Sequence, residues 1–217
     1  MLNRFVFCAL IIVVWASLGF AQTTTNSDDY HKFEVFGGYS NNQVDTGLPN
    51  YNNDVRGFFG DRETFHGFEV SAVGNVNRYV GIKASISGHF KDYEFNVPVS
   101  FSPPITNRLE IDSSIYNFLG GVQVKDNAKE GSRFRPFAHA LIGVAHRRNE
   151  FSGSFCQQPN SGCDQSSTGF AAAIGGGIDI KATKRLSIRA FQFDYNPNRL
   201  NDTTKHNFRF GFGLVFH

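Results

Sequence analysis

The feature that most constrains this chain is an alternation of apolar and polar or small residues near its C-terminal end. Within residues 207–216 every second side chain is large and apolar, and the positions between them carry Asn, Arg, Gly, Gly and Val. The apolar positions are Phe208, Phe210, Phe212, Leu214 and Phe216. Successive side chains of a β-strand point to opposite faces, whereas a helix repeats about every 3.6 residues. The segment is therefore predicted to be a strand with one apolar face.

Earlier segments repeat this alternation, and each is predicted to be a strand. Their apolar faces carry residues such as Phe68, Val70 and Ile82, and the opposite faces carry mainly Glu, Ser, Lys and Gly. The predicted strands are Lys32–Ser40, Thr64–Asn75, Tyr79–Lys91, Glu110–Lys125, Phe134–Arg147, Gly169–Lys181 and Leu186–Tyr195. With the last segment they make eight strands and predict an all-β fold.

The segment Leu186–Tyr195 departs from strict alternation. A continued count from its first residues would put Gln192 and Asp194 on the apolar face. A β-bulge near Ala190 and Phe191 adds one residue and returns both polar side chains to the opposite face. The alternative is a strand that leaves the apolar layer early. We favour the bulge.

The connectors between the predicted strands alternate in length. Short turns are expected at residues 76–78, 126–133 and 182–185, and longer connectors at 41–63, 92–109, 148–168 and 196–204. Antiparallel neighbours in a barrel place alternate connectors on opposite rims, and outer-membrane barrels keep short turns on the periplasmic rim. The chain is thus predicted to form an eight-stranded antiparallel up-and-down transmembrane β-barrel with four extracellular loops.

Composition indicates which face of the wall looks inward. The chain has 24 Phe and 22 Gly but a mean hydropathy of only −0.27, a blend that arises when lipid-facing and inward-facing residues alternate. The presumed inner face combines small residues with charges of both signs. Its polar cluster is predicted to be Glu34, Glu69, Lys83, His139, Asp179, Arg189 and Arg209. Because an eight-stranded barrel is just wide enough for side chains to fill, we expect a filled core.

The N-terminus is predicted to be a secretory signal. Arg4 precedes an apolar stretch that ends near Trp15, and Gly19 and Ala21 form a small-residue cleavage site. The stretch is shorter than the roughly 20 residues that a helical anchor needs. We expect a cleaved signal peptide over residues 1–21, a short polar segment over 22–31 and the barrel over 32–217.

The mature chain would keep two cysteines, Cys156 and Cys163. An exported protein meets an oxidising periplasm, so a disulfide between them is expected. A metal or redox site is the alternative, but the spacing is too wide for C-x-x-C and no His lies between the two.

Four segments resemble small OmpA-type outer-membrane barrels of the opacity-protein and porin-family group. They are Phe33–Ser40, Asn75–Gly81, Arg135–Ala140 and Leu186–Tyr195. The resemblance implies the outer membrane of a Gram-negative-type bacterium, contact with outer-membrane lipid and lipopolysaccharide, and a monomer. It also implies periplasmic chaperones and the barrel-assembly machinery as partners.

In such barrels the aromatic last strand is the assembly signal, which here falls on Phe208, Phe210, Phe212, Leu214 and Phe216. Two departures from the resemblance matter. Phe216 is followed by a final His217, where family barrels end on an aromatic residue. OmpA itself continues into a peptidoglycan-binding domain, so cell-wall anchoring is not expected here.

The sequence contains no recognised catalytic, cofactor or metal motif. Ser87 and His89 share a strand face, as a His and Ser do in some barrel enzymes that deacylate lipid A, but they share the inward face of Lys83. A net charge of +2 without basic runs gives no indication of nucleic-acid binding. We predict a non-enzymatic surface protein, without cofactor or metal, whose four loops serve envelope integrity, adhesion or binding of an extracellular ligand. The alternatives are a narrow porin-like channel, a lipid A-modifying enzyme and a soluble lipocalin-like binder.

Overall fold

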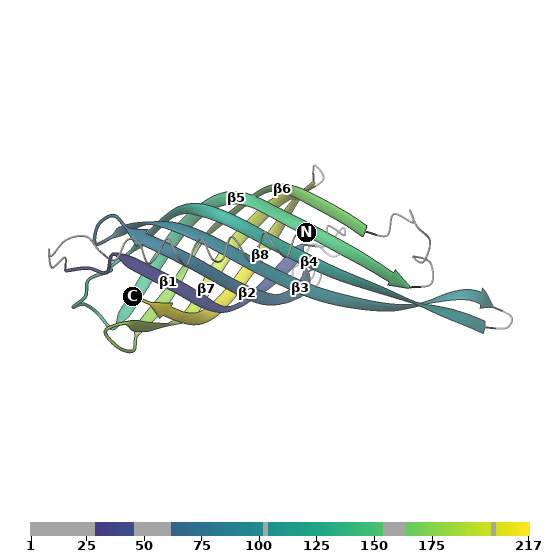
Figure 1. The fold of residues 1–217 in the computed structure, drawn as a ribbon, viewed down its shortest axis with the longest axis horizontal. Helices are drawn as coiled ribbons and strands as arrows, with labels where there is room; N and C mark the ends of the chain where they lie inside the picture. Colours follow the sequence, from purple (N-terminus) through teal and green to yellow (C-terminus); the bar gives the residue numbers. More distant parts are fainter. Residues whose placement is uncertain (1–28, 46–61, 102–103, 154–163, 201–202) are drawn as a thin grey trace, which may run out of the picture.

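The computed structural model describes residues 29–45, 62–101, 104–153, 164–200 and 203–217. They form one antiparallel sheet in which each strand pairs with the next and the last pairs with the first (Figure 1). The strands are β1 (Phe33–Asp45), β2 (Arg62–Asn75), β3 (Val80–Phe101), β4 (Pro104–Lys125), β5 (Phe134–Gly153), β6 (Asp164–Lys181), β7 (Leu186–Leu200) and β8 (Thr203–Phe216). The predicted eight-stranded up-and-down barrel is confirmed.

Closure of the barrel depends on the pairing of β1 with β8. The register runs from Val35 opposite Phe216 to Gln43 opposite Phe208. Each strand therefore has a hydrogen-bonded neighbour on both sides, which removes the free edges that an open sheet would expose to lipid.

The apolar faces of the strands point outward. Phe212 is 57% exposed and Ile142 is 65% exposed, whereas Arg209, in the same strand as Phe212, is 1% exposed. This arrangement is the reverse of a lipocalin-like barrel, in which the apolar face surrounds a ligand. The outward position of these side chains confirms the predicted orientation of the wall.

The predicted bulge in β7 is confirmed. Pairing with β8 is regular up to Arg189 and resumes at Gln192, and opposite it on β6 Ile178 pairs with Phe191 while Asp179 pairs with Arg189. Gln192 and Asp194 are consequently buried inside the barrel, as the sequence predicts.

Several strands are longer than predicted. Residues 92–101 and 104–109, expected in a loop, continue β3 and β4 as a paired hairpin that ends at Phe101 opposite Pro104. The connector expected at 196–204 is likewise mostly strand. The prediction failed there because both faces of a strand meet water beyond the membrane, so the apolar and polar alternation disappears while the backbone pairing persists.

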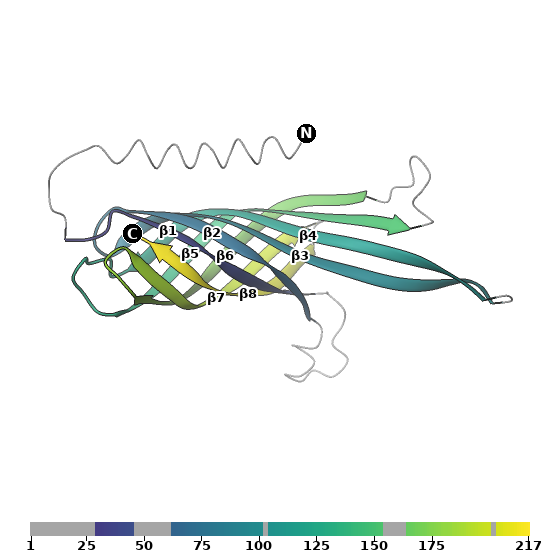
Figure 2. The same cartoon turned by 60° about the horizontal axis from the view of Figure 1, so that its bottom comes forward.

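The extra length forms a sheet that extends past the barrel at one end. β4 pairs with β5 as far as Leu109 opposite Gly153, and β5 pairs with β6 as far as Glu150 opposite Asp164. In contrast, β2 and β3 pair only up to His66 opposite Phe90. Figures 1 and 2 show this extension at the end away from the C-terminus.

The other end of the barrel carries the short turns and is covered by a segment we call the strap, residues 29–32. The strap crosses to the β4–β5 turn, where His31 N donates to Asn127 O and Lys129 N donates to Asp29 O. The Asn75 side chain donates to His31 O at 2.7 Å. By the usual asymmetry of outer-membrane barrels, this is the periplasmic end.

Within the part of the chain that the structure describes, no helix is long and apolar enough to cross a membrane. The predicted signal peptide, residues 22–28 of the polar segment, Cys156 and Cys163 lie outside the described residues.

Deleting Ala190 is expected to prevent barrel formation. Without the extra residue, either Arg189 or the pair Gln192 and Asp194 would face lipid, where charged side chains cost about 2–4 kcal/mol at mid-bilayer. A folded barrel resists SDS until heated and then changes mobility on a gel. The deletion should remove this heat-dependent shift, whereas Ala190→Ser, which keeps the residue count, should retain it. An unchanged shift after the deletion would show that the bulge is dispensable.

Candidate functional site

The structure places all seven predicted polar residues inside the barrel, and each is at most 4% exposed. The buried carboxylates among the described residues are Glu34, Glu69, Asp179 and Asp194, and the buried Lys and Arg side chains are Lys83, Lys125, Arg135, Arg189 and Arg209. Lys125 was absent from the predicted cluster. Its signal was present in the sequence, because it shares the parity of Asn117, Leu119 and Gln123 on the inner face of β4.

Lys125 organises the periplasmic part of this network. Its Nζ lies 2.6 Å from Glu34 Oε2 and 3.1 Å from Asp179 Oδ2. Asp179 in turn accepts from Arg189 Nε at 2.8 Å. One lysine thus links β1, β4 and β6, and Asp179 extends the connection to β7.

Asp194 organises the middle part of the network. Its Oδ2 lies 2.6 Å from Arg209 Nη2, and its Oδ1 lies 2.9 Å from His139 Nε2. Gln192 donates to both Glu69 and Asp194, at 2.9 and 2.8 Å. Lys83 Nζ lies 3.5 Å from Glu69 Oε1. Strands on opposite sides of the barrel are therefore joined through its centre.

Arg189 also packs between two aromatic rings in the lumen. Its Cζ lies 4.3 Å from the centroid of Phe36 and 4.0 Å from that of Phe137, a cation–π arrangement. A Cβ at residue 213 would lie 2.4 Å from the backbone oxygen of Gly37 and 2.9 Å from a ring carbon of Phe36, so glycine is needed there. The glycine-rich inner face therefore makes room for rings within a narrow lumen.

A cluster of apolar side chains fills the part of the lumen on the extracellular side of the ion-pair network. Leu119, Leu141, Ala145, Ala171 and Ala173, from β4 to β6, form a buried cluster against which Leu200 packs. Salt bridges, rings and this cluster together fill the lumen, as expected for eight strands.

Ser87 and His89 lie within this filled interior. Arg209 Nη1 and Asn117 Nδ2 each donate to Ser87 Oγ at 3.2 Å. His89 Nε2 lies 2.9 Å from Ser40 Oγ, and both Ser87 and His89 are fully buried. Neither side chain is exposed on the lipid-facing side of the wall.

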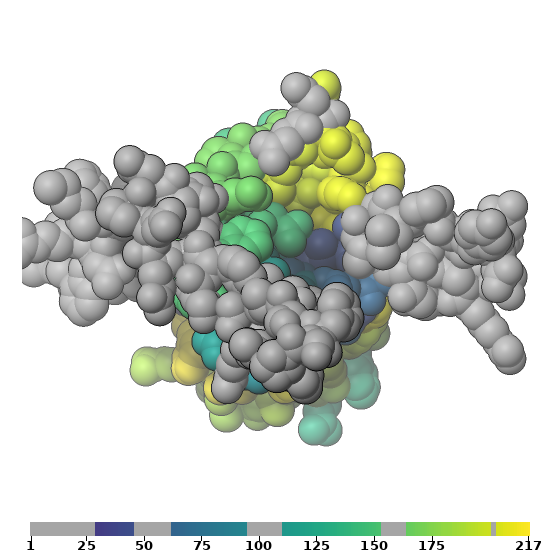
Figure 3. Space-filling model, turned by 90° about the vertical axis from the view of Figure 1, so that its right-hand side faces the viewer, coloured from purple at the N-terminus to yellow at the C-terminus, as the bar shows by residue number. Residues whose placement is uncertain are grey.

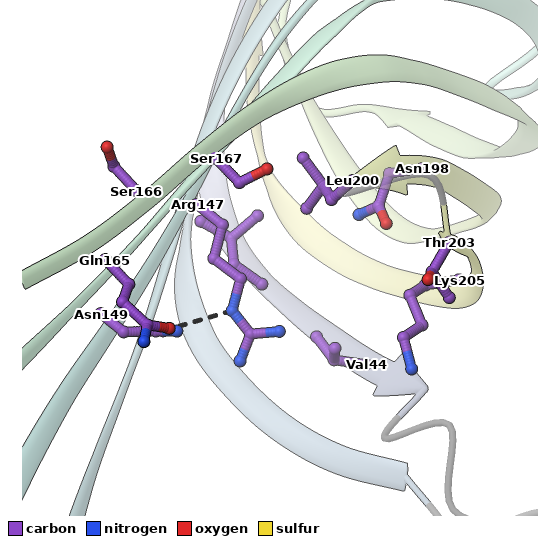
Figure 4. A pocket seen from close by; sticks show the side chains of 11 residues that line it. Val44, Arg147, Asn149, Gln165, Ser166, Ser167, Asn198, Leu200, Thr203 and Lys205 are labelled. Carbon is purple, nitrogen blue, oxygen red and sulfur yellow. Dashed lines mark hydrogen bonds between the residues drawn. The ribbon is translucent and has the colours of Figure 1, made fainter.

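The extracellular end of the barrel contains a cavity of about 320 Å³, which we call the vestibule. Looking at this end, Figure 3 shows a hollow between β5 and β6 in green and β7 and β8 in yellow. The lining residues are Val44, Ile115, Arg147, Asn149, Gln165, Ser166, Ser167, Asn198, Leu200, Thr203 and Lys205. They come from β1 and from β4 to β8, with the basic side chains of Arg147 and Lys205 directed into the cavity (Figure 4).

A comparison with known protein families identifies the family to which this barrel belongs. The profile of the outer membrane protein beta-barrel domain matches residues 11–216. The chain belongs to this family. Its place in the outer membrane of a Gram-negative-type bacterium follows from the family and from the outward apolar face of the barrel. No curated protein sequence matches the chain.

Two solved structures illustrate the shared fold of this family member. The attachment invasion locus protein Ail of Yersinia pestis, solved with the heparin analogue sucrose octasulfate, is 17% identical with a TM-score of 0.53. That comparison covers 85% of this chain and 97% of Ail. Neisserial surface protein A is 12% identical with a TM-score of 0.54, over 86% of this chain and 97% of that protein. At these identities the likeness extends to the fold alone.

The periplasmic strap of this barrel carries a titratable group. The rings of His31 and the C-terminal His217 lie 4.4 Å apart, and His217 also contacts Glu34 and Ser187. Burial and the neighbouring His217 lower the pKa of His31 from 6.5 to about 4. Arg135 and Lys129 act in the same direction, and Glu34 opposes them. Among the residues that the structure describes, no group of three or more His, Cys, Asp or Glu is arranged to hold a metal ion.

Lys125→Met should destabilise the barrel strongly. The substitution leaves Glu34 and Asp179 without their shared cation, and removing one partner of a buried pair costs about 3–5 kcal/mol. Urea unfolding of the lipid-folded barrel measures the loss. Lys181→Met, at the more exposed end of β6, is the matched control and should change little. Adding Glu34→Gln to Lys125→Met should restore part of the stability, and equal effects of the two lysine variants would contradict the assignment.

Acidification should release the strap. Above pH 6.5 His31 is neutral in both the docked and the released strap. Between about pH 6.5 and 4, His31 binds a proton only when the strap is released. Docking of the strap therefore weakens as the pH falls through this range. Hydrogen exchange of residues 29–32, corrected for intrinsic rates, should rise from pH 7 to 5, and His31→Gln should flatten this response. The turn at Asp126 is an internal reference, because the hydrogen bond from Arg78 lowers the pKa of Asp126 to about 2. Equal changes at both places would contradict a role of His31.

Proposed function

We propose that this barrel is a non-enzymatic surface protein, in which a filled transmembrane wall displays an extracellular sheet and loops that bind a partner outside the cell. The observation that carries the proposal is the continuation of β3 to β6 as a paired sheet beyond the membrane wall. A hydrogen-bonded sheet holds its side chains in fixed relative positions, as a recognition surface requires.

The side chains of this extension suit an aqueous surface. On the outer side, Arg148 Nε lies 2.7 Å from Glu150 Oε1, and its Nη2 lies 3.7 Å from Asp164 Oδ2. These groups replace the exposed Phe, Val and Ile that cover the lower wall. Because exposed ion pairs contribute little to stability, their presence agrees better with a solvent-facing recognition surface than with a stabilising role.

The interior argues against a narrow channel as the main function. The network around Lys125 and Asp194 joins opposite strands through the lumen, and conduction would require several short ion pairs to open together. The interior also argues against a lipid A-modifying enzyme, since Ser87 and His89 point away from the acyl chains.

We also propose the lipid, assembly and oligomeric partners that the family suggests. The last strand would be read by the barrel-assembly machinery after delivery by periplasmic chaperones, with Phe216 as its terminal outward ring, since Phe216 is 53% exposed. His217 turns inward to Glu34 and Ser187, which leaves the outward row of rings uninterrupted. The folded protein would be a monomer in contact with lipopolysaccharide.

Shortening the β3–β4 hairpin should abolish partner binding without unfolding the barrel. Lys91 pairs with Ser113, so an Asn-Gly turn can replace residues 92–112 and close the hairpin there. The native barrel in nanodiscs, tested on an array of extracellular-matrix proteins without free glycans, should bind at least one component, and the shortened barrel should lose that binding while keeping its heat-dependent mobility.

Planar-bilayer recording separates this proposal from the channel alternative. The native barrel should give no steady unitary current. A clear unitary conductance, together with array binding that survives the hairpin replacement, would favour the channel and contradict the display function.

A further inference from the structure

The floor of the vestibule contains buried amide groups that lack hydrogen-bond partners among the described residues. Asn198 lines the cavity and is 3% exposed, yet its Oδ1 has no partner. Three buried residues outside the lining also have side-chain atoms without partners among the described residues: Asn196 Oδ1, Asn207 Nδ2 and both polar atoms of Asn42. They lie two positions along their strands from the lining residues Asn198, Lys205 and Val44. Buried polar atoms are nearly always paired in folded proteins, so Asn198 Oδ1, which lies on the cavity wall without a partner among the described residues, favours a polar occupant.

The mouth of the vestibule is basic. Among the eleven described residues that line the vestibule, Arg147 from β5 and Lys205 from β8 are the charged ones, and none is a carboxylate. The Arg147 guanidinium donates to two neutral oxygens, Asn149 Oδ1 at 3.3 Å and Ser113 Oγ at 3.5 Å. Figure 4 shows both basic side chains reaching into the same space. An occupant with a negative group is therefore favoured.

An apolar patch completes the lining. Val44 and Ile115 are buried and belong to one cluster with Phe65, and Leu200 packs on the cluster of β4 to β6. A small inorganic anion would leave this patch unused, and a simple hydrocarbon would leave the amides unpaired. A sugar ring presents hydroxyl groups at its edge and C–H groups on its face, so it can use both.

We propose that the vestibule binds an acidic saccharide of roughly one or two rings, a size suited to a cavity near the lower limit of ligand sites. The carboxylate or sulfate lies between Arg147 and Lys205, a ring hydroxyl donates to Asn198 Oδ1, and the ring face packs on Leu200 and Ile115. This inference goes beyond the display function, because it assigns a ligand class to the barrel mouth and does not involve the hairpin.

The test uses the full barrel in nanodiscs and calorimetric titration with a sulfated chondroitin disaccharide, which carries both a carboxylate and a sulfate. We expect saturable one-to-one binding that weakens as salt rises. Lactose, a neutral disaccharide, and inorganic sulfate at the same concentrations should bind far more weakly. Equal binding of sulfate would reduce the site to a simple anion site, and equal binding of lactose would remove the role of the charge; either result overturns the proposal.

Two adjacent arginines on β5 supply the matched variants. Arg147→Gln removes the inward cation and should weaken binding about tenfold or more, as loss of a charge-assisted hydrogen bond does. Arg148→Gln removes its outward neighbour and should leave the affinity unchanged. Asn198→Asp, nearly the same shape, should also weaken binding by placing a negative charge on the floor. Equal effects of the Arg147 and Arg148 variants, or none from Arg147, would overturn the site.

Folding and display are monitored separately. Each variant is first checked for heat-dependent mobility in SDS, and Arg147→Lys, which keeps the charge, should retain much of the affinity. The barrel with the shortened hairpin keeps the whole vestibule lining and should bind the disaccharide normally. Failure of the vestibule and failure of the proposed display function are thus distinguishable.

Discussion

Every backbone amide and carbonyl inside a bilayer needs a hydrogen-bond partner, because no water is available there. The chain meets this requirement by pairing β8 with β1, from Gln43 opposite Phe208 to Val35 opposite Phe216. Much of the remaining architecture follows from this closure. A closed sheet of eight strands has a lumen of fixed, small width, so one face of each strand must meet lipid and the other must pack into a narrow space. The alternation of apolar and polar residues along each strand reflects these two environments, lipid on one face and the lumen on the other.

The narrow lumen determines what the interior charges can do. A single buried charge would be expensive, but a set of opposite charges at 2.6 to 3.1 Å offsets much of that cost. Lys125 contacts two carboxylates and Asp194 contacts Arg209 and His139, so the network joins strands that share no backbone hydrogen bonds. The same contacts that hold the wall together occupy the space that a solute would need. Stability and closure of the lumen therefore have one physical origin.

The sequence was most informative where the chain meets lipid. The strand order, the outward rings, the inward charges and the bulge at Ala190 could all be predicted, because the bilayer imposes a clear contrast between the two faces. The inward position of Lys125 follows from its parity with Gln123, but its pairing with Glu34 and Asp179 could not be predicted, because only the closed barrel brings these strands together. The extension of β3 to β6 was also missed, because strands in water on both sides lose the alternation by which they are recognised. The vestibule could not be predicted, as Arg147 and Lys205 are 58 positions apart in the sequence and meet only through the curvature of the sheet.

The chain passes from a membrane-spanning wall to strands that extend into water, and this transition determines where a ligand could bind. In the middle of the barrel, charged residues such as Glu69 and Arg209 pair with one another. At the extracellular end, backbone pairing of β2 with β3 stops at Phe90, and Asn198 Oδ1 lines the vestibule without a partner among the described residues. The polar groups that could meet a ligand therefore lie at the extracellular mouth, beyond the buried ion-pair network, where the strands still hold side chains in place. The filled core does not compete with recognition at the mouth. It provides the rigid base that keeps the amides and the basic side chains of the vestibule in a fixed arrangement.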